Sequence, residues 1–346
     1  MVEEQSLTRS LTHIQTSFFL FSAYFCMGKD DAAWFYLRES MTLLQTIRLH
    51  EEVTYTNNQI YQLDDGVSAA YARRMFWVLF ITERAYALQR HRPLTLQSTL
   101  AVPSVSAMGP DVGVLTGFLD LISLFQHFDA DFIASWNSAN PARSPSSVSE
   151  YEPLSRLQDV LQYALPSASD HAEMQQADFL ISRQWLKIIV WKLCVAKTLL
   201  SNTGGEDSMS LHYPIAVTRD VVLISRLLPA RAFEANGVGI LEKIFDMGCS
   251  LADLLSVTPT TARQGSAMVI GPMDTLMEMV RIVGTTLGGN YRHLDVLADK
   301  ANRCLFMNVD RAVPLAVEQP RDESEAEIGQ VWSLDDDAAL QEFLSW

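Results

Sequence analysis

The amino-acid sequence predicts an all-α protein, a multi-helix bundle of packed helix pairs with an irregular acidic C-terminal tail. Apolar residues recur every three to four positions through most of the chain, which is the period of a helix with one buried face. The apolar–polar alternation of a strand never persists for more than a few residues, and no repeat of fixed length is found.

The first two helices are expected over residues 7–27 and 30–50, joined by a short turn at Gly28. Asp30 or Asp31 is the expected N-cap of the second helix, because a short acidic side chain can accept hydrogen bonds from the first turn. Four apolar residues at helical spacing mark the face that packs on the first helix: Trp34, Leu37, Met41 and Leu44.

A polar loop is expected over residues 54–66, followed by a long helix that starts near Ala72 and ends just before Pro93. An apolar stripe runs through this helix at Phe76, Leu79, Phe80 and Ala87. Glu83 falls on the same stripe, and a carboxylate that faces a core is costly unless a cation or several donors hold it. Five arginines crowd the helix: Arg73, Arg74, Arg84, Arg90 and Arg92. We therefore expect a buried acid–arginine contact among aromatic residues.

The rest of the chain continues in helices up to a polar tail. The further helices are expected over residues 112–136, 154–165, 172–200, 217–228, 233–257, 266–287 and 290–306. The glycine pairs Gly204-Gly205 and Gly288-Gly289 mark helix ends. Residues 139–153 contain three prolines and several serines, which favours a surface linker within a helical domain of residues 1–313.

Residues 314–346 form a separate segment in which large apolar residues alternate with Asp and Glu. This composition is typical of acidic activation segments, because the acids keep exposed anchor residues in solution. The candidate anchors are Trp332, Phe343 and Trp346. A frayed tail, or a short helix docked on the domain, is the alternative interpretation.

Composition and charge restrict the class of function. The chain is 48% hydrophobic and 19% charged, which favours a folded domain over wholesale disorder. Its formal net charge of -15 opposes tight binding to phosphates, so we expect no direct specific binding of DNA by this chain. The most apolar N-terminal stretch, residues 18–27, is too short to cross a bilayer and follows an acidic start, so we expect no membrane partner.

The polar residues indicate neither a metal site nor a catalytic site. The four cysteines, Cys26, Cys194, Cys249 and Cys304, are far apart, and we expect buried, reduced thiols in an intracellular protein. The seven histidines are scattered singly, and no Gly-rich phosphate loop or Gly-x-Ser-x-Gly motif is present. His127, Asp129 and Asp131 could suggest a metal trio, but their helix faces diverge and a solvated helix edge is favoured. We expect no cofactor and no enzyme activity.

Four short motifs carry a family resemblance: Arg73-Arg74, Phe76-Trp77, Glu83-Arg84 and His91-Arg92-Pro93. In this order they resemble the middle homology region of fungal zinc-cluster transcription factors, most closely the sugar- and quinate-responsive members. The family has Asp where Glu83 stands and Gly where His91 stands. Its second helix closes with Leu-Gly-Leu-His, and here Arg48 replaces the Gly. The six closely spaced cysteines of the family's zinc cluster are absent from this chain.

The resemblance leaves two roles open for the polar residues of the long helix. One is a structural network, in which Glu83 and Arg84 pair with neighbouring helices and Arg73 or Arg74 reaches Glu83 or a loop carbonyl. The other is a contact with a partner or with a small polyhydroxylated or acidic effector. The residues considered for both are Arg73, Arg74, Trp77, Glu83, Arg84, Arg90, His91 and Arg92.

The resemblance implies a transcriptional regulator of a metabolic or secondary-metabolite gene cluster. We expect it in the nucleus, either exclusively or with a fraction in the cytoplasm. It would act through its regulatory domain and lack its own zinc-cluster module. Expected partners are other transcription regulators or co-activators, a small-molecule effector and a second copy in a homodimer. The alternative is a cytoplasmic ligand-binding or scaffold protein, derived from such a regulator, that does not bind DNA.

Overall fold

The computed structural model describes residues 2–56, 66–103, 112–138, 151–165, 168–197, 199–200, 207–258, 271–286 and 291–312. These residues form thirteen α-helices, one short 3-10 helix and no β-strand, which confirms the predicted all-α class. The α-helices are α1 Val2–Cys26, α2 Asp30–Thr46, α3 Glu52–Thr56, α4 Gly66–Arg90, α5 Val112–Phe125, α6 Ala130–Ser138, α7 Tyr151–Tyr163, α8 Glu173–Ala196, α9 Tyr213–Leu227, α10 Ala230–Ala235, α11 Gly237–Val257, α12 Pro272–Thr285 and α13 Leu294–Ala312.

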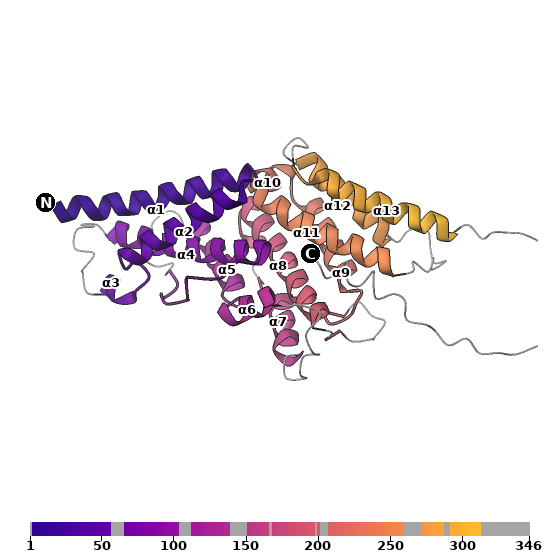
Figure 1. The fold of residues 1–346 in the computed structure, drawn as a ribbon, viewed down its shortest axis with the longest axis horizontal. Helices are drawn as coiled ribbons and strands as arrows, with labels where there is room; N and C mark the ends of the chain where they lie inside the picture. The colour runs from indigo at the N-terminus through magenta and orange to yellow at the C-terminus, as the bar shows by residue number, and fades with distance from the viewer. Residues whose placement is uncertain are drawn as a thin grey trace, which may run out of the picture.

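Helices α1 and α2 form a long antiparallel hairpin along one edge of the elongated molecule (Figure 1). The turn between them lies at Gly28, as expected, with a φ of +71°. A side chain at this position would also collide with the guanidinium of Arg292, whose Nη1 lies 2.1 Å from the place of a Cβ. The N-cap prediction was wrong, because Lys29 occupies the cap and makes no side-chain cap bond. Asp30 and Asp31 lie in the first turn instead, where the positive end of the helix dipole stabilises a carboxylate.

Helix α8 lies at the centre of the fold, in contact with α5, α7, α9, α10 and α11 (Figure 1). Its residues 181–194 are buried on nearly every side, Gln184 and Lys187 included, because other helices enclose it. Trp185 and Trp191 are fully buried, and each indole N–H finds a partner: the Asp246 carboxylate of α11 at 2.8 Å and the Ser210 carbonyl at 2.9 Å. Aromatic burial with a satisfied N–H therefore fixes α8 among its neighbours.

Two helices predicted as continuous are each divided into two. The predicted helix over residues 112–136 is split into α5 and α6, because the Asp129 carboxylate accepts the backbone N–H of Phe132 at 2.8 Å and so starts a new helix. The predicted helix over residues 233–257 breaks between α10 and α11, where Gly237 has a φ of +61°. Part of the loop predicted over residues 54–66 is the short helix α3.

Several predictions fall wholly or partly outside the described residues. They are the glycine pairs Gly204-Gly205 and Gly288-Gly289, the linker up to residue 150, and the tail residues Trp332, Phe343 and Trp346. The last three residues of the predicted linker belong to α7. Cys194 and Cys304 are buried as expected, but Cys249 is only partly buried and Cys26 is exposed, so the expectation of four buried thiols was wrong for Cys26 and only partly met at Cys249. None of the described helices is long and apolar enough to cross a membrane.

Candidate functional site

The loop formed by residues 92–103 lies against α4 and is tied to it at its far end by Arg73. The Arg73 guanidinium donates to both carboxylate oxygens of Glu52 at 2.6 and 2.8 Å and to the Ala101 carbonyl at 3.1 Å. Trp77 donates its indole N–H to the same carbonyl at 3.3 Å, and Glu52 accepts the Ala101 N–H at 3.0 Å. The Arg73 hydrogen bonds hold the pKa of Glu52 below its usual value. Arg73 was expected to reach either Glu83 or a loop carbonyl, and it contacts the loop carbonyl of Ala101.

Glu83 is buried on the apolar stripe of α4, with 1% of its surface exposed. Its carboxylate accepts the backbone N–H of Thr95 at 2.6 Å and that of Leu96 at 2.9 Å. The nearest guanidinium in an ion pair, that of Arg38 in α2, lies 3.9 Å away. Burial raises the pKa of Glu83, and the two N–H donors act against that rise. The expected arginine partner from α4 itself is therefore replaced by the backbone of the loop 92–103.

Arg84 is the buried counterpart of Glu83 on the neighbouring face. Its guanidinium donates to the Phe80 carbonyl at 3.3 Å and to the Leu96 carbonyl at 3.2 Å, so it also binds the loop 92–103. Burial lowers its pKa to about 10, while the charges of Glu83 and Asp129 oppose the shift. The sequence led us to expect an acid on a neighbouring helix as the partner of Arg84. Its hydrogen bonds go to backbone carbonyls instead, and Asp129 acts on Arg84 through its charge alone.

Arg90 belongs to a cluster of four charged residues, called here the Glu242 cluster: Asp30, Arg90, Glu242 and Arg292. Glu242 of α11 is 5% exposed and accepts hydrogen bonds from Arg90 at 3.1 Å and Arg292 at 2.8 Å. Arg90 also pairs with Asp30 at 3.3 Å, and the Tyr86 hydroxyl donates to the Asp30 carbonyl at 3.0 Å. The cluster joins the end of α4 and the start of α2 to α11, so the role of Arg90 is to join distant helices.

His91 and Arg92 follow the last residue of α4 and contact α6. The imidazole of His91 stacks on the indole of Trp136 with ring centres 5.2 Å apart, and that indole donates to the Leu88 carbonyl at 3.0 Å. The amide of Asn137 donates to the Arg92 carbonyl at 3.2 Å, and the Arg92 guanidinium lies over the Trp34 ring at 5.4 Å. The exit of α4 is therefore fastened to α6 by aromatic and backbone contacts.

Arg74 differs from the other residues of the motif because it lines a cavity of about 500 Å³ between α4, α5 and the start of α8. Its guanidinium lies over the Tyr71 ring at 5.3 Å. The other lining residues are mostly apolar, with Gln175, Asp178 and Asn236 as the polar exceptions. Arg74 therefore lies beside a space that a ligand or partner side chain could enter.

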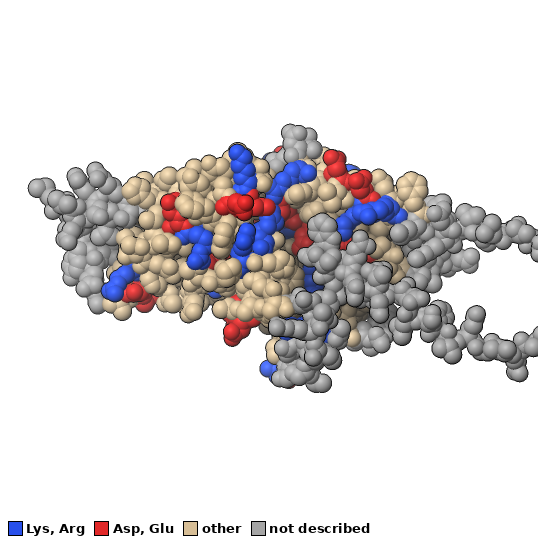
Figure 2. Space-filling model, viewed as in Figure 1, with Lys and Arg blue, Asp and Glu red and all other residues tan. Residues whose placement is uncertain are grey.

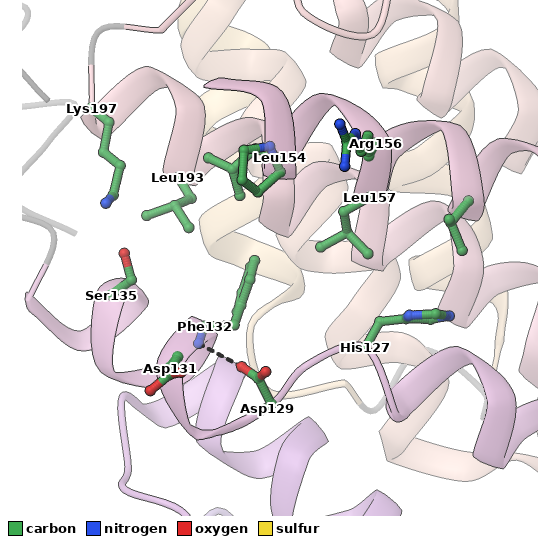
Figure 3. Close-up of a pocket in the computed structure, with 12 residues that line it drawn as sticks. His127, Asp129, Asp131, Phe132, Ser135, Leu154, Arg156, Leu157, Leu193 and Lys197 are labelled. Carbon is green, nitrogen blue, oxygen red and sulfur yellow. Dashed lines mark hydrogen bonds between the residues drawn. The ribbon is translucent and has the colours of Figure 1, made fainter. Parts of the chain in front are cut away.

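A second cavity, of about 520 Å³, lies between α6, α7 and the C-terminal end of α8, and is called here the trough (Figure 3). Its apolar floor is formed by Phe132, Leu154, Leu157, Val160 and Leu193, and its polar rim by His127, Asp129, Asp131, Ser135, Arg156 and Lys197. The suggested trio of His127, Asp129 and Asp131 does line one cavity. Even so, no group of three or more His, Cys, Asp or Glu residues within the described ranges is placed to hold a metal ion.

The surface charges do not form a one-sided basic patch on the face drawn in Figure 2, where Lys and Arg side chains are interspersed with Asp and Glu. The partners that sequence reasoning missed, Glu52, Arg38, Glu242 and Arg292, all lie outside the motif helix. Nothing in the spacing or composition around these residues indicated their partners on the motif helix.

The part of the chain that carries the motif helix and its loop is also the part that matches a known family model. Residues 2–103, which include the motif helix and the loop it holds, match the model of the fungal specific transcription factor domain. This part of the chain is similar to the fungal specific transcription factor domain. The match ends beside Ala101, the last residue that Arg73 and Trp77 hold.

Similarity to whole regulators extends beyond this domain. The chain is 27% identical to the probable sucrose utilization protein SUC1 of Candida albicans over 73% of its own length and 48% of that protein. It is 23% identical to the maltose fermentation regulatory protein MAL13 and to the respiratory transcription factor ZNF1, both of Saccharomyces cerevisiae, over 69% and 70% of its length and 50% of theirs. The chain thus spans about half the length of these curated relatives. No solved structure matches it.

Both positions where the domain family has glycine and this chain does not are left-handed. Arg48 has a φ of +59° and His91 a φ of +50°. Glycine adopts such angles without strain, whereas a residue with a Cβ does so at a cost. The glycines of the family motif are therefore explained by backbone conformation at the ends of α2 and α4, and this chain keeps the conformation without the glycines.

Proposed function

We propose that this chain is the regulatory part of a fungal transcriptional regulator that controls a metabolic gene set, and that the set serves sugar utilization. The observation that carries the proposal is the similarity to sucrose and maltose regulators, which continues through the helices that follow residue 103. The geometry is consistent with it, because the motif residues fasten α4 to the loop 92–103 and join its end to α2, α6 and α11 in one platform. A platform of that kind suits binding of partners more than chemistry.

The proposal includes a nuclear location and contacts with other regulators or co-activators. It also includes that these 346 residues make no sequence-specific contact with DNA, since the formal charge is -15 and acids accompany the bases on the face of Figure 2. A binding assay with duplex DNA checks this at physiological salt. A sequence-selective complex that survives such salt would contradict it.

The main test is a reporter experiment in yeast. The chain is fused to a foreign DNA-binding domain, and transcription from the matching promoter is measured on glucose, sucrose and maltose. We expect output above that of the DNA-binding domain alone, and a change in output with sucrose or maltose. Output equal to the bare domain on all three sugars would refute the proposal. A response that is the same on every carbon source would favour a regulator of secondary metabolism.

The tail residues 314–346 are proposed to supply activation. In the same reporter, alanine at Trp332, Phe343 and Trp346 should reduce output more than neutral residues at the tail acids, because buried aromatic anchors contribute most contact energy. Deleting everything after Arg321 should leave the melting temperature unchanged, since the last helix that the structure describes ends at Ala312. Undiminished output in the alanine variant, with normal protein levels, would refute the activation role.

A cytoplasmic scaffold or ligand-binding protein remains the second candidate. It predicts the same fold with no transcriptional output in any fusion. Fluorescence imaging of the tagged chain separates the two, because a scaffold of this kind would stay outside the nucleus on all carbon sources.

A further inference from the structure

We propose that the trough between α6, α7 and α8 binds a small, uncharged, polyhydroxylated molecule of disaccharide size. The proposal rests on the proposed function, because it supplies the effector site of a sugar-responsive regulator. Three features of the structure support it: the lining of the trough, its charges and the connection of α6 to the family motif.

The lining of the trough combines an apolar floor with polar ends. Figure 3 shows the Phe132 ring directed into the space below Leu154 and Leu193, while the Lys197 amine and the Ser135 hydroxyl face each other at one end. Small-molecule sites are usually apolar cavities of about 300–1,000 Å³ with a few fixed polar groups, and the volume of about 520 Å³ falls in that range. A sugar presents an apolar C–H face together with hydroxyls at its edge, so it fits such a lining.

The charges around the trough favour an uncharged ligand. Its rim carries two carboxylates, Asp129 and Asp131, and two cations, Arg156 and Lys197. Arg156 already pairs with Glu152, and the charge of Asp129 acts on Arg84, so charges of both signs are partly compensated within the protein. A ligand with net charge would gain from one pair and lose to the other. Hydroxyl groups can donate to the carboxylates and accept from the cations and from Ser135, and therefore satisfy both kinds of group.

One polar group of the rim is already fixed in position. The carboxylate oxygen Oδ1 of Asp129 accepts the Phe132 N–H at 2.8 Å, which orients the whole group at the start of α6 (Figure 3). The second oxygen is then held in place to accept from a ligand hydroxyl. A fixed acceptor loses less conformational entropy on binding than a mobile one.

Helix α6 connects the trough to the family motif. One side of α6 gives Phe132 and Ser135 to the trough. The next residues of the same helix hold the end of α4: Trp136, one turn after Phe132, donates to the Leu88 carbonyl at 3.0 Å, and Asn137 donates to the Arg92 carbonyl at 3.2 Å. A ligand that shifts α6 would therefore act directly on the segment that carries the Glu242 cluster and the loop 92–103.

The test is calorimetric titration of the 346-residue chain with sucrose and with maltose, with gluconate as a charged comparison. We expect at least one disaccharide to bind saturably and gluconate to give no saturable heat. Ser135→Phe, which fills the trough, should abolish binding. Asp129→Asn should weaken it by roughly tenfold or more, because the amide keeps the contact to Phe132 but loses the charged acceptor.

Two measurements keep the outcome interpretable. Asp159→Asn is the matched control, since this exposed acid of α7 does not line the trough, and it should bind as the unchanged chain does. Circular dichroism melts of each variant establish that it is folded. If Ser135→Phe does not fold, the comparison of Asp129→Asn with Asp159→Asn decides. No saturable heat for either disaccharide up to about 50 mM, or equal binding in the trough variants, overturns the proposal.

The reporter fusion separates this proposal from the proposed function. A sugar response that persists in Ser135→Phe refutes the site and leaves the regulator in place. Disaccharide binding that is lost in Ser135→Phe, together with a silent fusion, supports the site and refutes the regulator.

Discussion

Glu83 accepts the backbone N–H of Leu96 at 2.9 Å, so the buried acid of the motif helix holds the loop that follows that helix. Glu83 and Arg84, the acid–arginine pair of the family motif, are thus neighbours in the sequence that both bind the backbone of Leu96. Glu83 accepts from its N–H, and Arg84 donates to its carbonyl at 3.2 Å. Neighbouring side chains of opposite charge clamp one residue of the loop from both sides.

The first prediction concerns Glu83. Replacement by Leu leaves the N–H groups of Thr95 and Leu96 buried without an acceptor, and each stranded donor costs about 1–3 kcal/mol, so we expect a loss of roughly 3 kcal/mol or more. Glu83→Gln keeps one acceptor and should lose about half as much. Urea unfolding measures both, with the exposed Glu234→Gln in α10 as control. Glu83→Leu unfolding like the unchanged chain would show that the loop does not depend on this carboxylate.

The second prediction concerns the two left-handed positions. Arg48→Gly should raise the free energy of unfolding by about 0.5–1 kcal/mol, because the strain relieved exceeds the entropy cost of glycine. Arg48 loses only an exposed pair to Glu51 at 3.7 Å. His91→Gly should be near neutral, since it also loses the stacking on Trp136. Thermal melts check both, and alanine at position 48 should give no gain. Equal gains from alanine and glycine would exclude backbone strain as the cause.

The third prediction concerns the Glu242 cluster. Glu242→Gln removes the charge that Arg90 and Arg292 share, and breaking a buried pair in this way costs about 3–5 kcal/mol. Asp253→Asn on the same helix breaks a more exposed pair with Lys300 and should cost at most about 1 kcal/mol. Urea unfolding in low and high salt separates the cases, because only the exposed pair is screened. A small, salt-dependent loss for Glu242→Gln would mean that the cluster is solvated.

The fourth prediction uses the pH dependence of a buried lysine. Lys187 of α8 is 2% exposed and donates to Gln162, and burial lowers its pKa to about 8, reinforced by Arg183 and opposed by Asp220. Between pH 8 and the ordinary lysine pKa, Lys187 is mostly protonated in the unfolded chain and mostly neutral in the folded chain. The unfolded chain therefore binds more protons than the folded one, and the free energy of unfolding rises with pH over this window. Lys187→Met should therefore stabilise the protein below pH 8, and the gain should shrink towards pH 10. A gain that does not vary with pH would place the charge in solvent.

The sequence was sufficient for the features that depend on local pattern. The burial of Glu83 follows from its place on the apolar stripe, and the end of α4 follows from Pro93, which cannot continue a helix. The break at Asp129 was also readable, since an acidic residue three positions before Phe132 is an N-cap signal that was overlooked.

Other features depend on partners far away in the chain. Arg90 and Glu242 are separated by 152 residues, and no spacing rule pairs one charge with another at such a distance. The donors to Glu83 are backbone groups, which every residue carries, so side-chain identity could not indicate them. The trough is likewise assembled from three helices, and its lining residues are unremarkable in each of them.

The contact between Arg292 and the hairpin of α1 and α2 has a consequence for biosynthesis. Its Nη1 donates to the Phe25 carbonyl across a separation of 267 residues, and it lies against Gly28. A ribosome adds about 5–20 residues per second, so the hairpin waits on the order of tens of seconds before its final contact is made. Phe19 and Phe35 stay exposed in the finished fold, whereas Tyr86 of α4 covers Phe21, Phe25 and Trp34 and is made about 200 residues before Arg292. The hairpin can therefore pack on α4 well before its turn meets its last partner.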